Sequence, residues 1–298
     1  MNYFTTVKAL SERMKFAQRD WFYDFRELGE QISESECLKV ANSQAEAYSK
    51  ITKHWDSERN SEWICRHYLS AKMIMSATLN INTMLYAHAK NIRLTTPYLT
   101  YYALLSLLRG IVYTLPSIGW DNGKMITLTH SKIIQFSFEF IGKFNKDVAK
   151  NLKDTVIKAK ANRELISYKS PTSGDRIIDN DSDIITIATL FSELIQFNSE
   201  IMEASIAKNS QNKSVDFLHR YIKQINSLNL GGNIHQDKED SYRLGYLQRK
   251  HPSPPNVQHI MTEGHTEDFF GAWYPEDDSD EKDFFNPDKD WQIIFDIP

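Results

Sequence analysis

The stretch TPYLTYYALLSLLRGIVYTLP, residues 96–116, constrains the fold more than any other part of the sequence. It is almost entirely apolar and carries a single charge, Arg109, near its end. A membrane span needs about 20 consecutive apolar residues, and the run from Leu99 to Leu115 is both shorter than that and interrupted by Arg109. Pro97 suits the first turn of a helix, whereas Pro116 ends one. The stretch therefore predicts a helix that is buried in a protein core rather than one that crosses a membrane.

Apolar residues recur at helical spacing along most of the chain. Two or three helices are expected within residues 7–55, and further helices at 63–90, 129–144, 147–168, 184–207 and 215–225. The polar segments are expected to be a turn at 56–62, a loop at 169–183 that ends with Ser182 as an N-cap, and a linker at 208–214. Eleven glycines and nine prolines are few for 298 residues, which favours helices. The predicted fold class is mainly α.

The sequence changes in character after Asn226. Residues 226–268 contain glycines, three prolines and four histidines without a helical period, so an irregular segment is expected. The end, WQIIFDI, is apolar and β-branched and predicts a single strand. We therefore expect an N-terminal helical extension at 1–62, a helical bundle at 63–207 and an irregular, acidic C-terminal extension at 208–298.

Charge is distributed unevenly along the chain, whose net charge is −4. Residues 267–298 hold eleven acids and two bases, which leaves residues 1–266 with a net charge of +5. Acids in this tail alternate with Phe284, Phe285 and Trp291. The tail is either plain solvated surface or an acidic and aromatic docking segment. Such a segment would cover the basic helix of this chain or bind a basic groove on a partner protein.

Several kinds of site are not indicated by the sequence. Two cysteines, Cys37 and Cys65, cannot form a disulfide framework or a zinc site alone, and they fit a reducing compartment. The first residues lack the apolar core of a signal peptide, which favours a cytoplasmic protein. His235, His251, His259 and His265 match no zinc spacing, so neither a metal nor another cofactor is expected.

The span from Lys143 to Arg176 is basic, with nine lysines and arginines against four acids. Such a span could follow a phosphate backbone, and the alternative is a solvated outer face. The candidate nucleic-acid contacts are Lys150, Lys153, Lys158, Lys160, Arg163 and Lys169. Few aromatic residues lie between these positions, so the span itself does not predict a platform on which single-stranded bases stack. Arg109 either pairs its head with a carboxylate or water, or lies with Arg163 beside an anion.

The order of features between residues 63 and 207 resembles the HEPN superfamily of helical bundles. Tyr101, Tyr102 and Ala103, followed by Arg109, are similar to one helix of that family. The segment Thr129–Lys132 resembles the start of the next helix, and Arg163 with Ser167 and Tyr168 resembles the end of a third. The helix expected at 184–207 would pack back on the others. The resemblance covers about half of the chain and implies a HEPN-like bundle.

The family members that cut RNA carry an arginine followed, after four to six residues, by a histidine, and two such helices meet in a dimer. The resemblance therefore implies a homodimer and RNA as a ligand. Tyr168 occupies the position of the histidine, and tyrosine is a poor base at neutral pH. We therefore expect a nucleic-acid-linked or partner-binding protein of the bacterial toxin–antitoxin or phage-defence type, without the usual ribonuclease histidine.

Two alternatives remain open. The first is an active, metal-independent endoribonuclease with an altered site, in which Arg163, Tyr168 and His130 are the catalytic residues. The second is a structural interaction module. His130 has its own simpler interpretation, because a histidine that follows Thr129 at a helix start is often a capping or surface residue.

Overall fold

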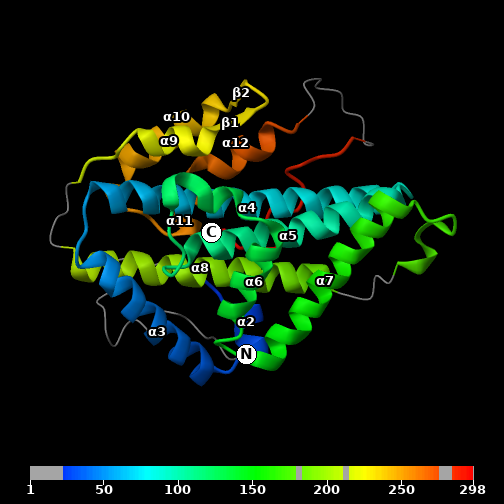
Figure 1. Ribbon diagram of the computed structural model, residues 1–298, viewed down its shortest axis with the longest axis horizontal. Coiled ribbons are helices and arrows are strands. Elements are labelled where there is room, and N and C mark those ends of the chain that lie inside the picture. The colour runs from blue at the N-terminus through cyan, green and yellow to red at the C-terminus, as the bar shows by residue number, and fades with distance from the viewer. Residues whose placement is uncertain (1–22, 179–182, 211–214, 275–283, 298) are drawn as a thin grey trace.

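The computed structural model describes residues 23–178, 183–210, 215–274 and 284–297, and it is mainly helical (Figure 1). The larger helices are α2 (Arg26–Gln31), α3 (Glu34–Thr52), α4 (Ser57–Ala89), α5 (Thr96–Thr114), α6 (His130–Ile141), α7 (Lys146–Lys169) and α8 (Ile184–Asn209). A C-terminal group follows, with α9 (Arg220–Asn226), β1 (Ser227–Leu230), β2 (Asn233–Gln236), α10 (Lys238–Lys250), α11 (Val257–Ile260) and α12 (Thr266–Gly271). Short 3-10 or π turns lie at Arg93–Thr95, Asp121–Thr127, Gly174–Ile177 and Met261–His265. The predicted fold class, mainly α, is confirmed.

Helix α5 is the centre of the core. Helices α4 and α8 run beside it, and α6 and α7 also pack on it (Figure 1). Leu104, Leu108 and Ile111 of α5 are completely buried. The apolar stretch that opens at residue 96 is therefore a core helix, as predicted. Among the residues that the structure describes, no helix has both the length and the apolar character that a membrane crossing requires.

Side-chain caps set the helix starts. Ser33 forms a capping box with Glu36 at the start of α3, and Asn145 accepts from two backbone N–H groups at the start of α7. Asp183 caps α8 by accepting from the backbone N–H of Thr186. The expected cap, Ser182, lies outside the described residues. These caps pair the first N–H groups of each helix, which have no partner within the helix.

The turn that was predicted at residues 56–62 is wrong, because these residues begin the longest helix. Asp56 accepts from the backbone N–H of Arg59, and α4 starts at Ser57. Ser61 is buried and binds the carbonyl of Ser57 while it accepts from the backbone N–H of Leu218. The segment is polar because its side chains pair with each other and with the C-terminal group. A polar run of this kind hides a helix from an analysis of apolar periodicity.

The irregular structure that was predicted for residues 226–268 is also wrong. Strands β1 and β2 pair antiparallel through a turn at Gly231 and Gly232, both of which have positive φ. Helix α10 follows and buries Leu244 and Leu247, and α9, α10 and α12 cover one side of α4 (Figure 1). The helical period of α10 rests on few apolar residues, so it is weak in the sequence.

The C-terminal segment packs without forming the predicted strand. Ile294 and Phe295 are buried, and the hydroxyl of Ser192 on α8 donates to the carbonyl of Ile294. Phe285 packs on Tyr86 of α4. Residues 284–297 therefore dock on α4 and α8. The described contacts of the tail are thus with α4 and α8 and not with the basic span that it was expected to cover, whereas residues 275–283 lie outside the described residues.

Candidate nucleic-acid interface

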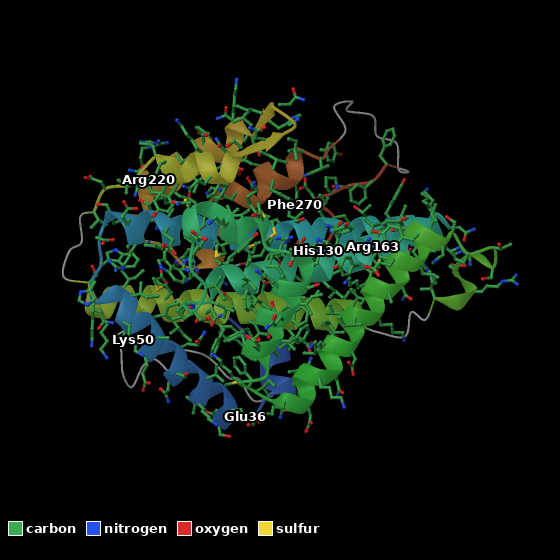
Figure 2. The ribbon with its side chains drawn as sticks, viewed as in Figure 1. Glu36, Lys50, His130, Arg163, Arg220 and Phe270 are labelled. Atoms are coloured by element: carbon green, nitrogen blue, oxygen red, sulfur yellow. The ribbon has the colours of Figure 1, made fainter. Side chains whose placement is uncertain are left out.

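Three helices bring together most of the residues that the sequence singled out. Tyr101 and Tyr102 come from α5, His130 is the first residue of α6, and Arg163 and Tyr168 lie near the end of α7. Figure 2 shows His130 and Arg163 close to one another where α7 crosses α5. We call these five residues the Tyr101 cluster. The structure therefore places all three predicted catalytic residues, His130, Arg163 and Tyr168, in one neighbourhood.

Tyr101 connects the cluster. Its ring is fully buried, and its hydroxyl lies 2.9 Å from Nδ1 of His130. The guanidinium carbon of Arg163 lies 5.2 Å from the centre of the Tyr101 ring. Burial raises the pKa of the Tyr101 hydroxyl, although the charge of Arg163 and a hydrogen bond from it act in the opposite direction. Tyr101 therefore keeps its proton at neutral pH and can donate it to His130.

His130 is neutral at neutral pH. Burial lowers the pKa of its imidazole, and the positive charges of Arg109, Arg163 and Lys160 lower it further. Because Tyr101 donates to Nδ1, we assign the remaining ring proton to Nε2. His130 then presents an N–H donor rather than a free lone pair. Arg163, His130 and Lys160 together offer only hydrogen-bond donors, which is the requirement of an anion.

Exposed tyrosine rings flank the guanidinium. Arg163 lies over Tyr102 as well, at 5.9 Å from the ring centre, and the Tyr102 side chain is 41% exposed. Tyr168 is 73% exposed. Burial lowers the pKa of Arg163, but a hydrogen bond with Tyr168 and the neighbouring tyrosines raise it more, so it stays charged. The aromatic residues that the basic span itself lacks are thus mostly supplied by α5.

The six predicted nucleic-acid contacts do not share one face of α7. Lys160 lies near His130 and is 3.8 Å from Glu164. At about 100° per residue, Lys150, Lys153 and Lys160 fall on one side of the helix, whereas Lys158 and Lys169 fall on the opposite side. Lys158 lines a separate cavity between α4, α5, α7 and α8. The structure therefore groups Lys160 with Arg163 and separates Lys158 and Lys169 from them.

Arg109 has a structural role. Its guanidinium donates to the backbone carbonyls of Ile126 and Leu128, at 3.0 and 3.3 Å. These carbonyls end the segment that joins α5 to α6, so Arg109 fixes the loop that leads to His130. The partners are carbonyls and not the carboxylate that the sequence suggested. Its charge still reaches His130, because it contributes to the lowered pKa of that residue.

Sequence reasoning missed Tyr98 and did not predict its contact with Ser167. The hydroxyl of Ser167 donates to the hydroxyl of Tyr98, at 3.2 Å, and this contact joins α7 to the first turn of α5. The spacing of the tyrosines could have indicated Tyr98, because Tyr101 and Tyr102 follow it by three and four residues and share its face of α5.

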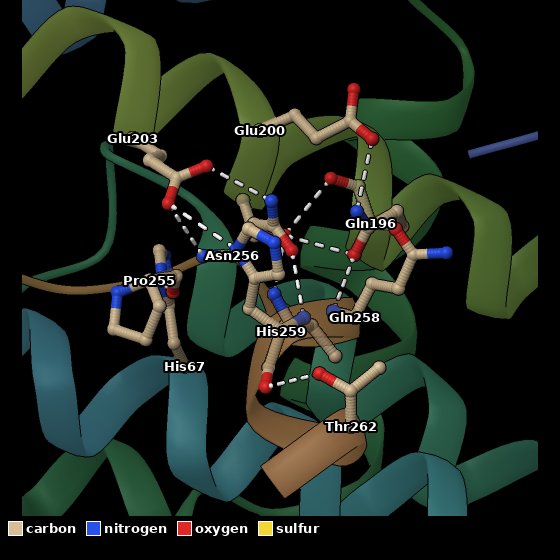
Figure 3. A network of polar contacts seen from close by, with 11 residues as sticks. His67, Gln196, Glu200, Glu203, Pro255, Asn256, Gln258, His259 and Thr262 are labelled. Atoms are coloured by element: carbon tan, nitrogen blue, oxygen red, sulfur yellow. Dashed lines mark hydrogen bonds and ion pairs between the residues drawn. The ribbon is translucent and has the colours of Figure 1, made fainter. Parts of the chain in front are cut away.

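A second polar region lies along α8 and is buried. Figure 3 shows its contacts with α11, in which Gln196 donates to Glu200 and accepts from the backbone N–H of Gln258, both at 2.9 Å. We call five of the buried polar residues of α8 the α8 seam; they are Glu193, Gln196, Asn198, Ser199 and Glu200. Their side chains pair with other parts of the chain, so the α8 seam holds the fold and is not a candidate ligand site.

Comparisons with known proteins supply no relative. No protein-family model, curated protein sequence or solved structure matches the chain. Within the described residues, no group of three or more histidine, cysteine, aspartate or glutamate side chains is arranged to hold a metal ion.

Proposed function

We propose that this chain is a HEPN-like protein of the bacterial toxin–antitoxin or phage-defence type that binds RNA at the Tyr101 cluster. One observation carries the proposal: the charges of Arg163 and Lys160 lie close enough to His130 to lower its pKa, and Arg163 contacts the exposed tyrosines Tyr102 and Tyr168. A donor-only group suits a phosphate, and exposed rings suit unpaired bases. The homodimer that the family resemblance implies belongs to the same proposal.

The two parts of the cluster have different tasks in this proposal. Arg163 and the Nε2–H of His130 hold a phosphate, with Lys160 adding charge. Tyr102 and Tyr168 stack bases on either side of the guanidinium, and such stacking contributes about 1–3 kcal/mol per base. The expected ligand is therefore a single-stranded or looped RNA segment, because bases in a duplex do not expose their faces.

A second candidate function is cleavage, and the position of His130 favours it. A neutral imidazole beside Arg163 is the pair that RNA transesterification needs. The imidazole would take the proton of the 2′-hydroxyl, the 2′-oxygen would attack the adjacent phosphorus, and the 5′-oxygen would leave with a proton from solvent. This step requires the lone pair at Nε2, and therefore the opposite tautomer from the one that Tyr101 favours. Binding without cleavage is accordingly the primary proposal.

A binding experiment with a matched control tests the proposal. Arg163→Ala is compared with Arg220→Ala, because Arg220 also lies over a tyrosine ring, at 5.6 Å from the centre of Tyr221, but at the other end of the molecule (Figure 2). Fluorescence anisotropy with labelled single-stranded RNA is measured over a salt series. Arg163→Ala should weaken binding and reduce the salt slope by about 1, whereas Arg220→Ala should change neither.

The same samples separate the alternatives. RNA that is cut in the presence of EDTA by the wild type, but not by His130→Ala, supports the endoribonuclease instead. Equal loss of affinity in both arginine variants would mean that RNA binds by general charge and not at the cluster. If RNA does not bind at low salt, a structural interaction module is the better description. Light scattering of the purified chain tests the homodimer.

A further inference from the structure

The cavity between α4, α5, α7 and α8 lies on the side of α7 that faces away from Lys160. Its volume is about 330 Å³. Its walls are mainly apolar and come from all four helices; the apolar residues are Met84, Leu85, Pro97, Ala159, Ile184 and Ile185. Pockets of this kind, mostly apolar with a few polar groups, are the usual form of small-molecule sites.

Two polar groups of the lining have no hydrogen-bond partner among the described residues. The first is the buried Oγ1 of Thr96. The side-chain amide of Asn162, which is half-buried, makes no hydrogen bond within the described part of the chain. Leaving a buried polar group unpaired is unfavourable by about 1–3 kcal/mol. This cost applies to the Oγ1 of Thr96, whereas the half-buried amide of Asn162 is open to a molecule that enters the cavity.

The charged groups of the lining are already engaged. Both carboxylate oxygens of Asp183 accept from Thr186, at 3.1 and 2.6 Å. Lys158 also has a partner of its own, and His88 lies at the exposed rim. An uncharged ligand would leave these contacts in place, and it suits walls that are mainly apolar.

We propose that this cavity binds an uncharged planar heterocycle of nucleobase size, read by the carboxamide of Asn162. A volume of about 330 Å³ lies within the range of small-molecule sites and has room for a single bicyclic base. A carboxamide offers a donor and an acceptor side by side, and this edge is complementary to the paired donor and acceptor of adenine. The apolar side chains of α4 and α8 provide the walls against which the ring lies. The site does not depend on RNA binding at the Tyr101 cluster.

The test uses the full chain with adenine as the probe, and indene as an apolar bicycle of similar size. Binding is measured by saturation-transfer NMR and titration calorimetry. Asn162→Leu keeps the size of the side chain but removes the donor and the acceptor. Asn151→Leu is the matched control, because Asn151 lies on the same helix and is exposed. Ala159→Phe fills the cavity, and thermal melts check that each variant is folded.

Adenine should bind to the wild type and to Asn151→Leu with the same affinity. Asn162→Leu should bind adenine at least about tenfold more weakly, because both hydrogen bonds of the carboxamide are lost, and should bind indene no more weakly than the wild type does. Ala159→Phe should bind neither; if it does not fold, Thr100→Phe takes its place. Arg163→Ala should keep full affinity for adenine, so that a failure of the RNA proposal is told apart from a failure of this one.

Three results would overturn the proposal. Adenine fails to bind to the wild type at millimolar concentration. Adenine binds, but equally to Asn162→Leu and to Ala159→Phe, so that it occupies another place. Indene binds to the wild type as tightly as adenine does, in which case the cavity does not read a polar edge.

Discussion

The Tyr101 cluster and the α8 seam are both rich in polar groups, but the two regions treat those groups in opposite ways. In the α8 seam the side chain of Asn198 donates to Thr114 and accepts from Gln44, at 3.1 Å in both contacts. In the Tyr101 cluster Arg163 and His130 carry N–H donors beside the exposed rings of Tyr102 and Tyr168. Buried polar groups that pair within the chain specify the packing of its helices. Donors that outnumber acceptors at a surface are available to a ligand.

Two arginines show the same contrast. Arg66 is 1% exposed and donates to the carbonyls of Tyr113, Leu115 and Ile118, while Glu62 pairs with its charge at 2.7 Å. Arg163 is half-buried and lies against tyrosine rings. Arg66 therefore ties the end of α5 to α4, whereas Arg163 keeps a charge that the fold does not neutralise.

The largest effect that would test this contrast is on stability. Arg66→Met leaves the carboxylate of Glu62 and several carbonyls without their partner, and breaking a buried pair in this way costs about 3–5 kcal/mol. Arg59 is the control, because its pair with Asp56 is largely exposed and its removal should cost about 1 kcal/mol or less. Urea unfolding measures both variants. If both variants lose a similar free energy of unfolding, the burial of Arg66 does not make its ion pair more important than that of Arg59.

The next effect is a pH dependence of stability, which we expect from the α8 seam and not from the Tyr101 cluster. Burial raises the pKa of Glu193 to about 8. The carboxylate accepts hydrogen bonds from the backbone N–H groups of Leu28 and Glu27, and these bonds act in the opposite direction. The ordinary pKa of the carboxyl is 4.5. Between these values the folded state binds more protons than the unfolded state. The free energy of unfolding should therefore fall as the pH rises from about 4.5 to about 8, by up to about 1.4 kcal/mol per pH unit.

Unfolding in urea from about pH 5 to about pH 8 measures this trend. Glu193→Gln cannot titrate, so its stability relative to the wild type should increase steadily as the pH rises. Glu164→Gln, on the outer part of α7, is the control and should follow the wild type. A difference between Glu193→Gln and the wild type that stays constant with pH would show that Glu193 is ionised throughout.

The same contrast explains what the sequence could predict. Leu104 and Leu108 mark α5 by their apolar spacing, and the burial of that helix is confirmed. Gln196 and Ser199 look like an outer face of α8, but both are completely buried, because Gln258 and Val257 reach them from residues far along the chain. Apolar periodicity carries no information on polar partners that another segment brings.

For the candidate site, the resemblance named His130, Arg163 and Tyr168, and the fold places them together. It could not give the contact between Tyr101 and His130, since that contact depends on how α6 docks on α5. Lys158 and Lys169 were grouped with Lys160 by charge, although the helical period alone separates them. The HEPN assignment itself stays a prediction.

A smaller effect is expected on ligand binding. Tyr102→Ala removes an exposed ring beside Arg163, and RNA binding should weaken by about 1–3 kcal/mol. Tyr242→Ala is the matched control, because Tyr242 is 58% exposed and Arg243 lies over it at 5.3 Å, but on α10. Anisotropy titrations compare the two. If Tyr242→Ala weakens binding as much, the RNA is recognised over a wide surface and the Tyr101 cluster is not special.

The smallest effect tests whether only the lysines on one side of α7 contact RNA. Lys160 lies beside the Tyr101 cluster, near His130, whereas Lys169 lies on the other side of α7 and is exposed. The ammonium of Lys160 lies 3.8 Å from the carboxylate of Glu164. Such a partly exposed ion pair is weak, so Lys160 can leave Glu164 and bind a phosphate with little loss of free energy. Lys160→Ala should weaken RNA binding about twofold to tenfold and lower the salt slope by about 1. Lys169→Ala should leave the slope unchanged. Equal changes of slope would mean that RNA wraps around α7, and the contacts would then follow charge rather than the geometry of the Tyr101 cluster.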